Sequence, residues 1–192
     1  MKKTILSVSI AAFALLADAQ TGSTLLYGNF GVASLSNSDN SSGTLLTSKE
    51  TTVLFNLGVG YQYNANWTVG LNFEYNNDDQ DGSTVSAYVI DPFIRYAKPL
   101  SGIFSIYGQL QAGYAHGSTD LGSGANGFNA QVFPAIFINI KNGFGLNFNF
   151  GGLQYISVST KDNTGVSSSS KNFSFTFGQG LNFGISKNFT RK

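Results

Sequence analysis

Apolar and polar residues alternate along most of this chain with a period of two. The clearest case lies between Thr52 and Tyr75, where the alternation is interrupted once, at Asn64-Ala65-Asn66. The apolar positions are Val53, Phe55, Leu57, Val59, Tyr61 and Tyr63, then Trp67, Val69, Leu71, Phe73 and Tyr75. Because successive side chains of a β-strand point to opposite faces, this pattern predicts a hairpin of two long strands with one apolar and one polar face.

Six further stretches show the same alternation, which gives eight predicted strands. They cover residues 24–35, 85–97, 103–116, 128–140, 144–155 and 172–189. The connections after the first, third, fifth and seventh strands read as long polar loops (36–50, 77–84, 117–127 and 156–171), and the other three are short. An even number of antiparallel strands with long loops at one end predicts an all-β fold, an eight-stranded up-and-down transmembrane β-barrel.

The alternation alone does not say which face is outside, because a soluble barrel of the lipocalin type would bury its apolar face. Three observations favour an apolar face that looks outward at lipid. Only 11% of the residues are charged, against about a quarter in typical soluble domains. The apolar faces carry almost no charge, as expected where a charge near mid-bilayer costs roughly 2–4 kcal/mol. Aromatic residues also gather near strand ends, where membrane girdles lie: Tyr61, Tyr63, Trp67, Tyr75, Tyr96 and Tyr114.

The first residues resemble a secretory signal peptide. Lys2 and Lys3 precede an apolar run from Ile5 to Leu16, and Ala17-Asp18-Ala19 supplies small residues for cleavage before Gln20. We therefore expect a signal peptide over residues 1–19 and an outer-membrane β-barrel over residues 20–192 of a Gram-negative bacterium. The net charge of +1 gives no electrostatic reason to expect nucleic-acid binding.

The polar faces predict a filled lumen. Eight strands enclose a space just wide enough for side chains, so Asn, Gln and Tyr should plug it together with Glu74, Asp91 and Arg95. A buried Arg95 is expected to be neutralised by one or two of these carboxylates. A simple hairpin register does not place Arg95 opposite Glu74, so such a pair would form across the lumen. A proton or ion relay is the less favoured reading of the three charges.

Several short runs resemble a known family. They are Phe55-Asn56-Leu57-Gly58-Val59-Gly60-Tyr61, Asn66-Trp67-Thr68-Val69-Gly70-Leu71, Pro92-Phe93-Ile94-Arg95-Tyr96, Phe150-Gly151-Gly152-Leu153-Gln154-Tyr155 and Phe183-Gly184-Ile185-Ser186-Lys187-Asn188-Phe189. In these runs the chain resembles the small outer-membrane β-barrel family common in Bacteroidetes, which is broadly similar to the OmpA transmembrane domain and OmpX. The resemblance spans the mature chain. It implies a location and a fold, and no single activity.

Two motifs could carry chemistry. His116-Gly117-Ser118 has the His and Ser spacing seen in outer-membrane lipid A deacylases, but such an enzyme needs an acid, and the nearest candidate is Asp120 in a glycine-rich stretch. Asn77, Asp79 and Asp81, followed by Gly82, copy the first half of a calcium loop, yet Tyr88 stands where its later glutamate would be. We read these motifs as a rim histidine and a solvated loop.

We therefore predict no catalytic, metal-binding or cofactor-binding residues and no cofactor. The expected function is that of a non-enzymatic, monomeric barrel with a structural or surface role. Its partners would be the lipid of the outer membrane and an extracellular ligand at the long loops. A narrow, porin-like channel for small or apolar solutes is the alternative, and a lipid-modifying enzyme is a third, less favoured reading.

Overall fold

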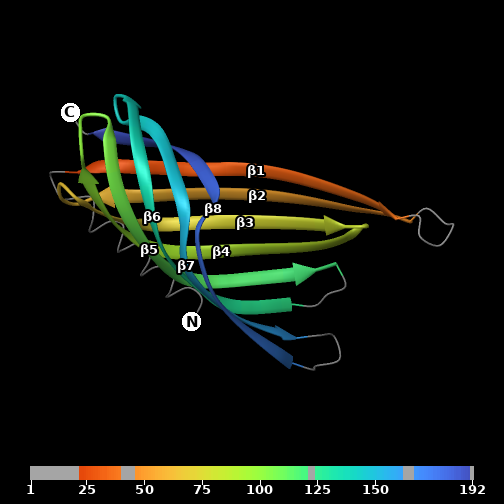
Figure 1. Cartoon of the computed structure of the whole chain (residues 1–192). Helices are drawn as coiled ribbons and strands as arrows, with labels where there is room; N and C mark the ends of the chain where they lie inside the picture. The colour runs from red at the N-terminus through yellow and green to blue at the C-terminus, as the bar shows by residue number, and fades with distance from the viewer. Residues whose placement is uncertain (1–21, 40–45, 121–123, 162–166, 191–192) are drawn as a thin grey trace.

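The computed structural model describes residues 22–39, 46–120, 124–161 and 167–190. The predicted signal peptide lies outside the described residues and stays a prediction. The chain forms the eight strands β1 (Ser23–Asp39), β2 (Leu46–Gln62), β3 (Trp67–Gln80), β4 (Ser83–Pro99), β5 (Phe104–Thr119), β6 (Gly124–Lys141), β7 (Phe144–Lys161) and β8 (Ser167–Thr190). Each strand pairs antiparallel with its neighbours, and β8 returns to β1, so the sheet is a closed barrel (Figure 1). In the part of the chain described here, no helix is long and apolar enough to cross a membrane.

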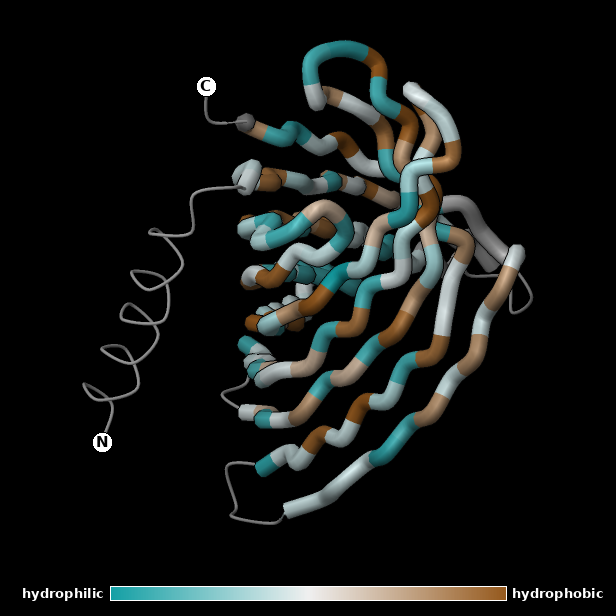
Figure 2. The backbone as a smooth tube through the Cα atoms, turned by 90° about the vertical axis from the view of Figure 1, so that its left-hand side faces the viewer, coloured by the Kyte–Doolittle hydropathy of each residue, from teal (hydrophilic) through white to brown (hydrophobic). Residues whose placement is uncertain are grey.

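The apolar faces of the strands look outward, as predicted. Leu57, Phe73 and Ile90 are exposed, whereas polar neighbours such as Asn72 and Gln109 are buried inside the barrel. Figure 2 shows the resulting alternation of hydrophilic and hydrophobic positions along the strands. A soluble barrel would have the opposite arrangement, so the outer surface is suited to hydrocarbon and the lumen to polar groups.

The tight turns gather at one end of the barrel, which we call the inner end. Here Asn64 Oδ1 accepts hydrogen bonds from the backbone N–H groups of Asn66 (2.9 Å) and Trp67 (3.0 Å), which fixes the β2–β3 turn. The end of β8 also lies there, because Asn188 N donates to Gly143 O in the β6–β7 turn (2.8 Å). The opposite ends of the strands, with the β3–β4 turn, lie at the other end, which we call the outer end (Figure 1).

The outer connections are shorter than the sequence predicted. The expected loop 77–84 is instead two strand ends joined by a two-residue turn, in which Asp81 and Gly82 both have positive φ (52° and 83°). Strands likewise continue into the expected loops 36–50, 117–127 and 156–171. The reason is that polar side chains bond across the strands: Asn77 Nδ2 donates to Ser86 Oγ (2.8 Å) and Thr52 Oγ1 to Asp78 Oδ1 (2.7 Å). A two-stranded ribbon outside the membrane needs no apolar face. Runs of Ser and Asn in the sequence therefore do not show where such a strand ends.

A β-bulge interrupts β7 and β8 at mid-height. The register shifts between Asn149 and Gly151, and Gly151 has a φ of +99°, a conformation that favours glycine. The Asn149 side-chain oxygen accepts the Gly151 N–H at 2.7 Å. The bulge resets the alternation, so that Gly152 faces the lumen and Leu153 the outside.

Candidate functional site: the barrel lumen

Large side chains enter the lumen where the facing strand carries glycine. Tyr27 of β1 pairs with Gly58 of β2, and a Cβ at Gly58 would lie 2.1 Å from the Tyr27 ring. The ring therefore lies over the glycine, and its hydroxyl donates to Asn72 Oδ1 on the next strand (3.0 Å). Gly113 likewise leaves room between Asp91 and Asn129. Across it, Asn129 Nδ2 donates to Asp91 Oδ2 (2.9 Å).

Arg95 lies at the centre of the lumen in an aromatic cage. Its Cζ is 4.2 Å from the ring centroid of Tyr107 and 4.7 Å from that of Tyr27. Its Nε and Nη2 both donate to Gln109 Oε1, at 2.8 and 2.6 Å. Facing ring planes attract a guanidinium, most strongly where water is excluded. The cage thus holds a cation that is only 6% exposed.

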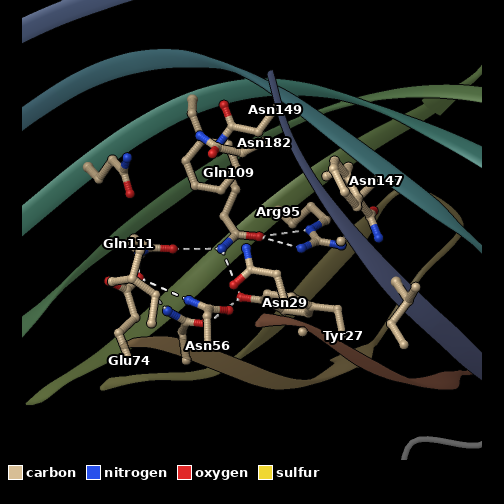
Figure 3. A pocket seen from close by; sticks show the side chains of 18 of the residues that line it. Tyr27, Asn29, Asn56, Glu74, Arg95, Gln109, Gln111, Asn147, Asn149 and Asn182 are labelled. Carbon is tan, nitrogen blue, oxygen red and sulfur yellow. Dashed lines mark hydrogen bonds between the residues drawn. The ribbon is translucent and has the colours of Figure 1, made fainter. Parts of the chain in front are cut away.

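The two carboxylates occupy the other end of the same network, where Figure 3 shows Glu74. Glu74 Oε1 accepts from Asn72 Nδ2 (2.8 Å), Asn56 Nδ2 (3.1 Å) and Gln111 Nε2 (3.2 Å). Gln111 Nε2 also donates to Asp91 Oδ2 (3.1 Å), so one amide bridges both acids. The three charges that the sequence placed in the lumen are therefore all there.

The expected pairing of Arg95 with these carboxylates is wrong, within the residues described. Gln109 stands between the charges: its Oε1 accepts from Arg95, while its Nε2 donates to Gln111 Oε1 (2.7 Å) and to the Tyr27 hydroxyl (3.0 Å). Two glutamines thus relay hydrogen bonds from the cation to the acids. The physical reason is register, because Arg95 lies opposite Thr68 and Gln109, two rows of lumen-facing residues away from Asp91.

Two cavities lie on either side of Arg95. The outer cavity has a volume of about 280 Å³, and the inner one about 140 Å³. Arg95, Tyr107 and Asn147 line both of them, so these side chains form the wall between the two. We call this wall the plug. Asn147 is unusual there, since it is only 8% exposed and neither its Oδ1 nor its Nδ2 has a hydrogen-bond partner.

The motifs at the outer rim do not form one site. His116 Nδ1 lies 2.9 Å from Asn126 Oδ1 and its ring packs beside Tyr88, whereas Asp120 Oδ2 accepts the Thr84 N–H (2.7 Å). Asn77, Asp79 and Asp81 also diverge. Asn77 bonds Ser86, Asp79 accepts from Gly82 and Thr84, and Asp81 accepts from Lys49 N (2.7 Å) and Ser48 Oγ (2.9 Å). Among the described residues, each of these side chains thus has its own bonding partner, and no three acidic or histidine side chains gather as a metal site.

Sequence analysis predicted tyrosine in the lumen but did not identify which aromatic side chains point inward. Tyr107 is buried at the plug, Tyr27 is half-buried beside it, and Phe93 packs edge-on against Tyr27, with ring centroids 5.7 Å apart. The signal was present, because Phe93 shares its parity with Asp91 and Arg95. This parity was not recognised as a signal, because an aromatic residue on a polar face is an exception to the alternation. It becomes interpretable only when the structure shows a glycine opposite it.

A closed barrel with an apolar outer face and a polar lumen is the fold of an integral outer-membrane β-barrel. The chain matches the family described as outer membrane protein beta-barrel domain over residues 4–191, and it belongs to that family. Matching solved structures include the translocator domain of autotransporter NalP from Neisseria meningitidis, with 13% identity and a TM-score of 0.44 over 100% of this chain and 78% of that one. A comparison with curated proteins found no match. The narrower likeness to OmpA-type or porin-like barrels, and the origin in Bacteroidetes, stay predictions.

Proposed function

We propose that this protein is a monomeric, non-enzymatic outer-membrane barrel whose lumen is plugged and does not conduct. The observation that carries the proposal is the wall shared by the two cavities. Arg95 is held there by two hydrogen bonds to Gln109 and by the rings of Tyr27 and Tyr107. An ion passing this wall would meet a fixed positive charge in a space already filled by side chains.

The outer ends of the strands support a surface role. The β1–β2, β3–β4 and β7–β8 ribbons continue past the apolar bands with Ser, Thr, Asn and Asp, and they present polar edges suited to an extracellular ligand. A non-enzymatic role is also supported by the partner of His116. An asparagine oxygen lacks the negative charge that a carboxylate uses to stabilise a charged imidazole.

Planar-bilayer recordings test the plug. We expect no conductance steps for the wild type, and steps for the double variant Arg95→Ala, Tyr107→Ala, because removal of both side chains joins the two cavities. Tyr114→Ala is the matched control, since it removes an aromatic side chain from the outward face. Retention of the heat-dependent shift in gel mobility would show that the variants fold. Regular steps from the wild type would instead favour the narrow channel.

A further inference from the structure

The boundary between β1 and β8 is only partly paired in the described residues. Its register runs from Ser23↔Thr190 to Gly28↔Ile185 and ends there, although β1 continues to Asp39 and β8 begins at Ser167. On its other side, β8 pairs with β7 out to Lys161↔Ser167. Figure 1 shows the outer parts of β1 and β8 diverging. We call this outer, unpaired part of the boundary the seam.

Side-chain exposure agrees with an open seam. Outward-facing phenylalanines next to it are 69% (Phe30), 65% (Phe175) and 69% (Phe183) exposed. Outward-facing residues on strands with two neighbours are less exposed, at 43% for Leu57, 39% for Phe73 and 44% for Ile106. The difference is what the loss of a neighbouring strand on one side produces.

The outer cavity reaches this seam. Its lining includes Asn29 of β1 and Asn182 of β8, which carry lumen-side carboxamides (Figure 3). It also includes Phe183 and Ile185, whose side chains are on the outer surface. The cavity thus reaches the edges of β1 and β8 that border the seam, and in the described residues no pairing between these two strands closes that side beyond Gly28↔Ile185. The lumen above the plug is therefore accessible from the side, at the level of the bilayer.

Apart from Arg95 and Glu74, which are hydrogen-bonded to neighbouring carboxamides, the polar groups that line the cavity are uncharged. Most of its polar lining is carboxamide: Asn29, Asn56, Asn72, Gln109, Gln111, Gln131, Asn147, Asn149, Gln154 and Asn182. A carboxamide both donates and accepts, as a hydroxyl does. Asn147 is buried and neither its Oδ1 nor its Nδ2 has a hydrogen-bond partner, which destabilises the fold until a partner is supplied. The lining thus suits a group bearing several hydroxyls.

We propose that the outer cavity binds the uncharged, hydroxyl-rich headgroup of a single-chain amphiphile that enters from the bilayer through the seam. The headgroup would bond Asn147 and its neighbouring carboxamides, and the alkyl chain would lie along Phe30, Phe183 and Ile185. A volume of about 280 Å³ falls just below the usual range for drug-sized ligands, so the cavity holds a headgroup and leaves the chain outside. The site lies on the outer side of the plug and requires no conduction.

Photolabelling of the full-length protein in phosphatidylcholine vesicles tests this proposal. The probe is dodecyl glucoside with a diazirine on its sugar. We expect saturable labelling of peptides that line the cavity, with unlabelled dodecyl glucoside competing at least tenfold better than dodecylphosphocholine or free glucose. Asn147→Leu should lower this labelling at least tenfold. Asn139→Leu is the matched control, because Asn139 also has an unpaired buried oxygen but lines neither cavity.

The variant separates binding from folding. Asn147→Leu removes a buried amide that makes no hydrogen bond, so its urea unfolding midpoint should equal or exceed that of the wild type while labelling falls. Unchanged labelling in a folded Asn147→Leu variant would overturn the headgroup site. Equal protection by free glucose would overturn entry from the bilayer.

Discussion

Glycines on the lumen face decide where the large inward side chains lie. Tyr27 can cross β2 to reach Asn72 and Gln109 only because Gly58 leaves its side-chain position free. Tyr27 in turn forms one face of the cage around Arg95. A single missing side chain on one strand therefore fixes the position of a charge two strands away.

Gly58→Ala tests this dependence. The added methyl would lie 2.1 Å from the Tyr27 ring, which is held by hydrogen bonds and by Arg95 and so cannot move freely. We expect a loss of about 1–3 kcal/mol in unfolding free energy, measured by urea titration in vesicles. Gly108→Ala is the control, because nothing lies within 4 Å of its added Cβ. Equal stability of the two variants would contradict the packing described.

We expect the stability of the outer rim to depend on pH through Asp81. Hydrogen bonds from the Lys49 N–H and the Ser48 hydroxyl hold the pKa of Asp81 below its ordinary 3.8. The pKa of Asp81 is lower in the folded protein than in the unfolded chain. The ionised Asp81 therefore contributes its full stabilisation at pH values above the ordinary pKa of 3.8, and this stabilisation is lost as the pH falls through the folded-state pKa. The Lys49 amide NMR shift should follow this titration. Asp81→Asn should abolish the change, and a midpoint above 3.8 in the wild type would contradict it.

At the scale of the strand, closure between β1 and β8 is the weakest element of the barrel. Six residue pairs join these strands, from Ser23↔Thr190 to Gly28↔Ile185, whereas thirteen pairs join β2 and β3. Beside the seam, the register between β7 and β8 shifts at the bulge between Asn149 and Gly151. Gly151 of β7 has a positive φ there, a conformation open chiefly to glycine.

An engineered disulfide measures this closure. A Cβ at Gly184 would lie 3.6 Å from Asn29 Cβ, within the range of disulfides, and the chain has no cysteine. We expect Asn29→Cys with Gly184→Cys to oxidise readily and to gain about 4 kcal/mol, because the closed loop exceeds 100 residues. The difference between the urea unfolding midpoints measured with and without reductant gives the stabilisation by the disulfide.

The control pair is Gly31→Cys with Leu54→Cys, at 3.8 Å across β1 and β2. Its loop is much shorter, so its gain should be smaller by about 1 kcal/mol. Failure of the first pair to oxidise in the folded protein would show that β1 and β8 are not adjacent at this level.

On the scale of the whole molecule, we predict that the outer end of the barrel faces the cell exterior, because barrels of this kind place their short turns on the periplasmic side. Residue Ser169 lies at the outer end of β8, and Asn64 lies in the β2–β3 turn at the inner end. In intact cells, a membrane-impermeant maleimide should label Ser169→Cys and should reach Asn64→Cys only after the outer membrane is permeabilised. The reverse pattern would invert the topology.

The sequence by itself determined the strands, the outward apolar faces and the membrane location. These follow from the period of two, which is local: Asn56 and Leu57 face opposite ways whatever strand lies beside them. The presence of Glu74, Asp91 and Arg95 in the lumen follows from the same parity.

Only the tertiary structure decided which of these groups meet. Gln109 separates Arg95 from the carboxylates because of the height at which β4 pairs with β5, and parity carries no information about height. The outer hairpins gained length from cross-strand bonds such as that between Thr52 and Asp78. The plug and the seam depend on how the first strand meets the last, a contact between residues some 160 positions apart, as in Leu26↔Lys187.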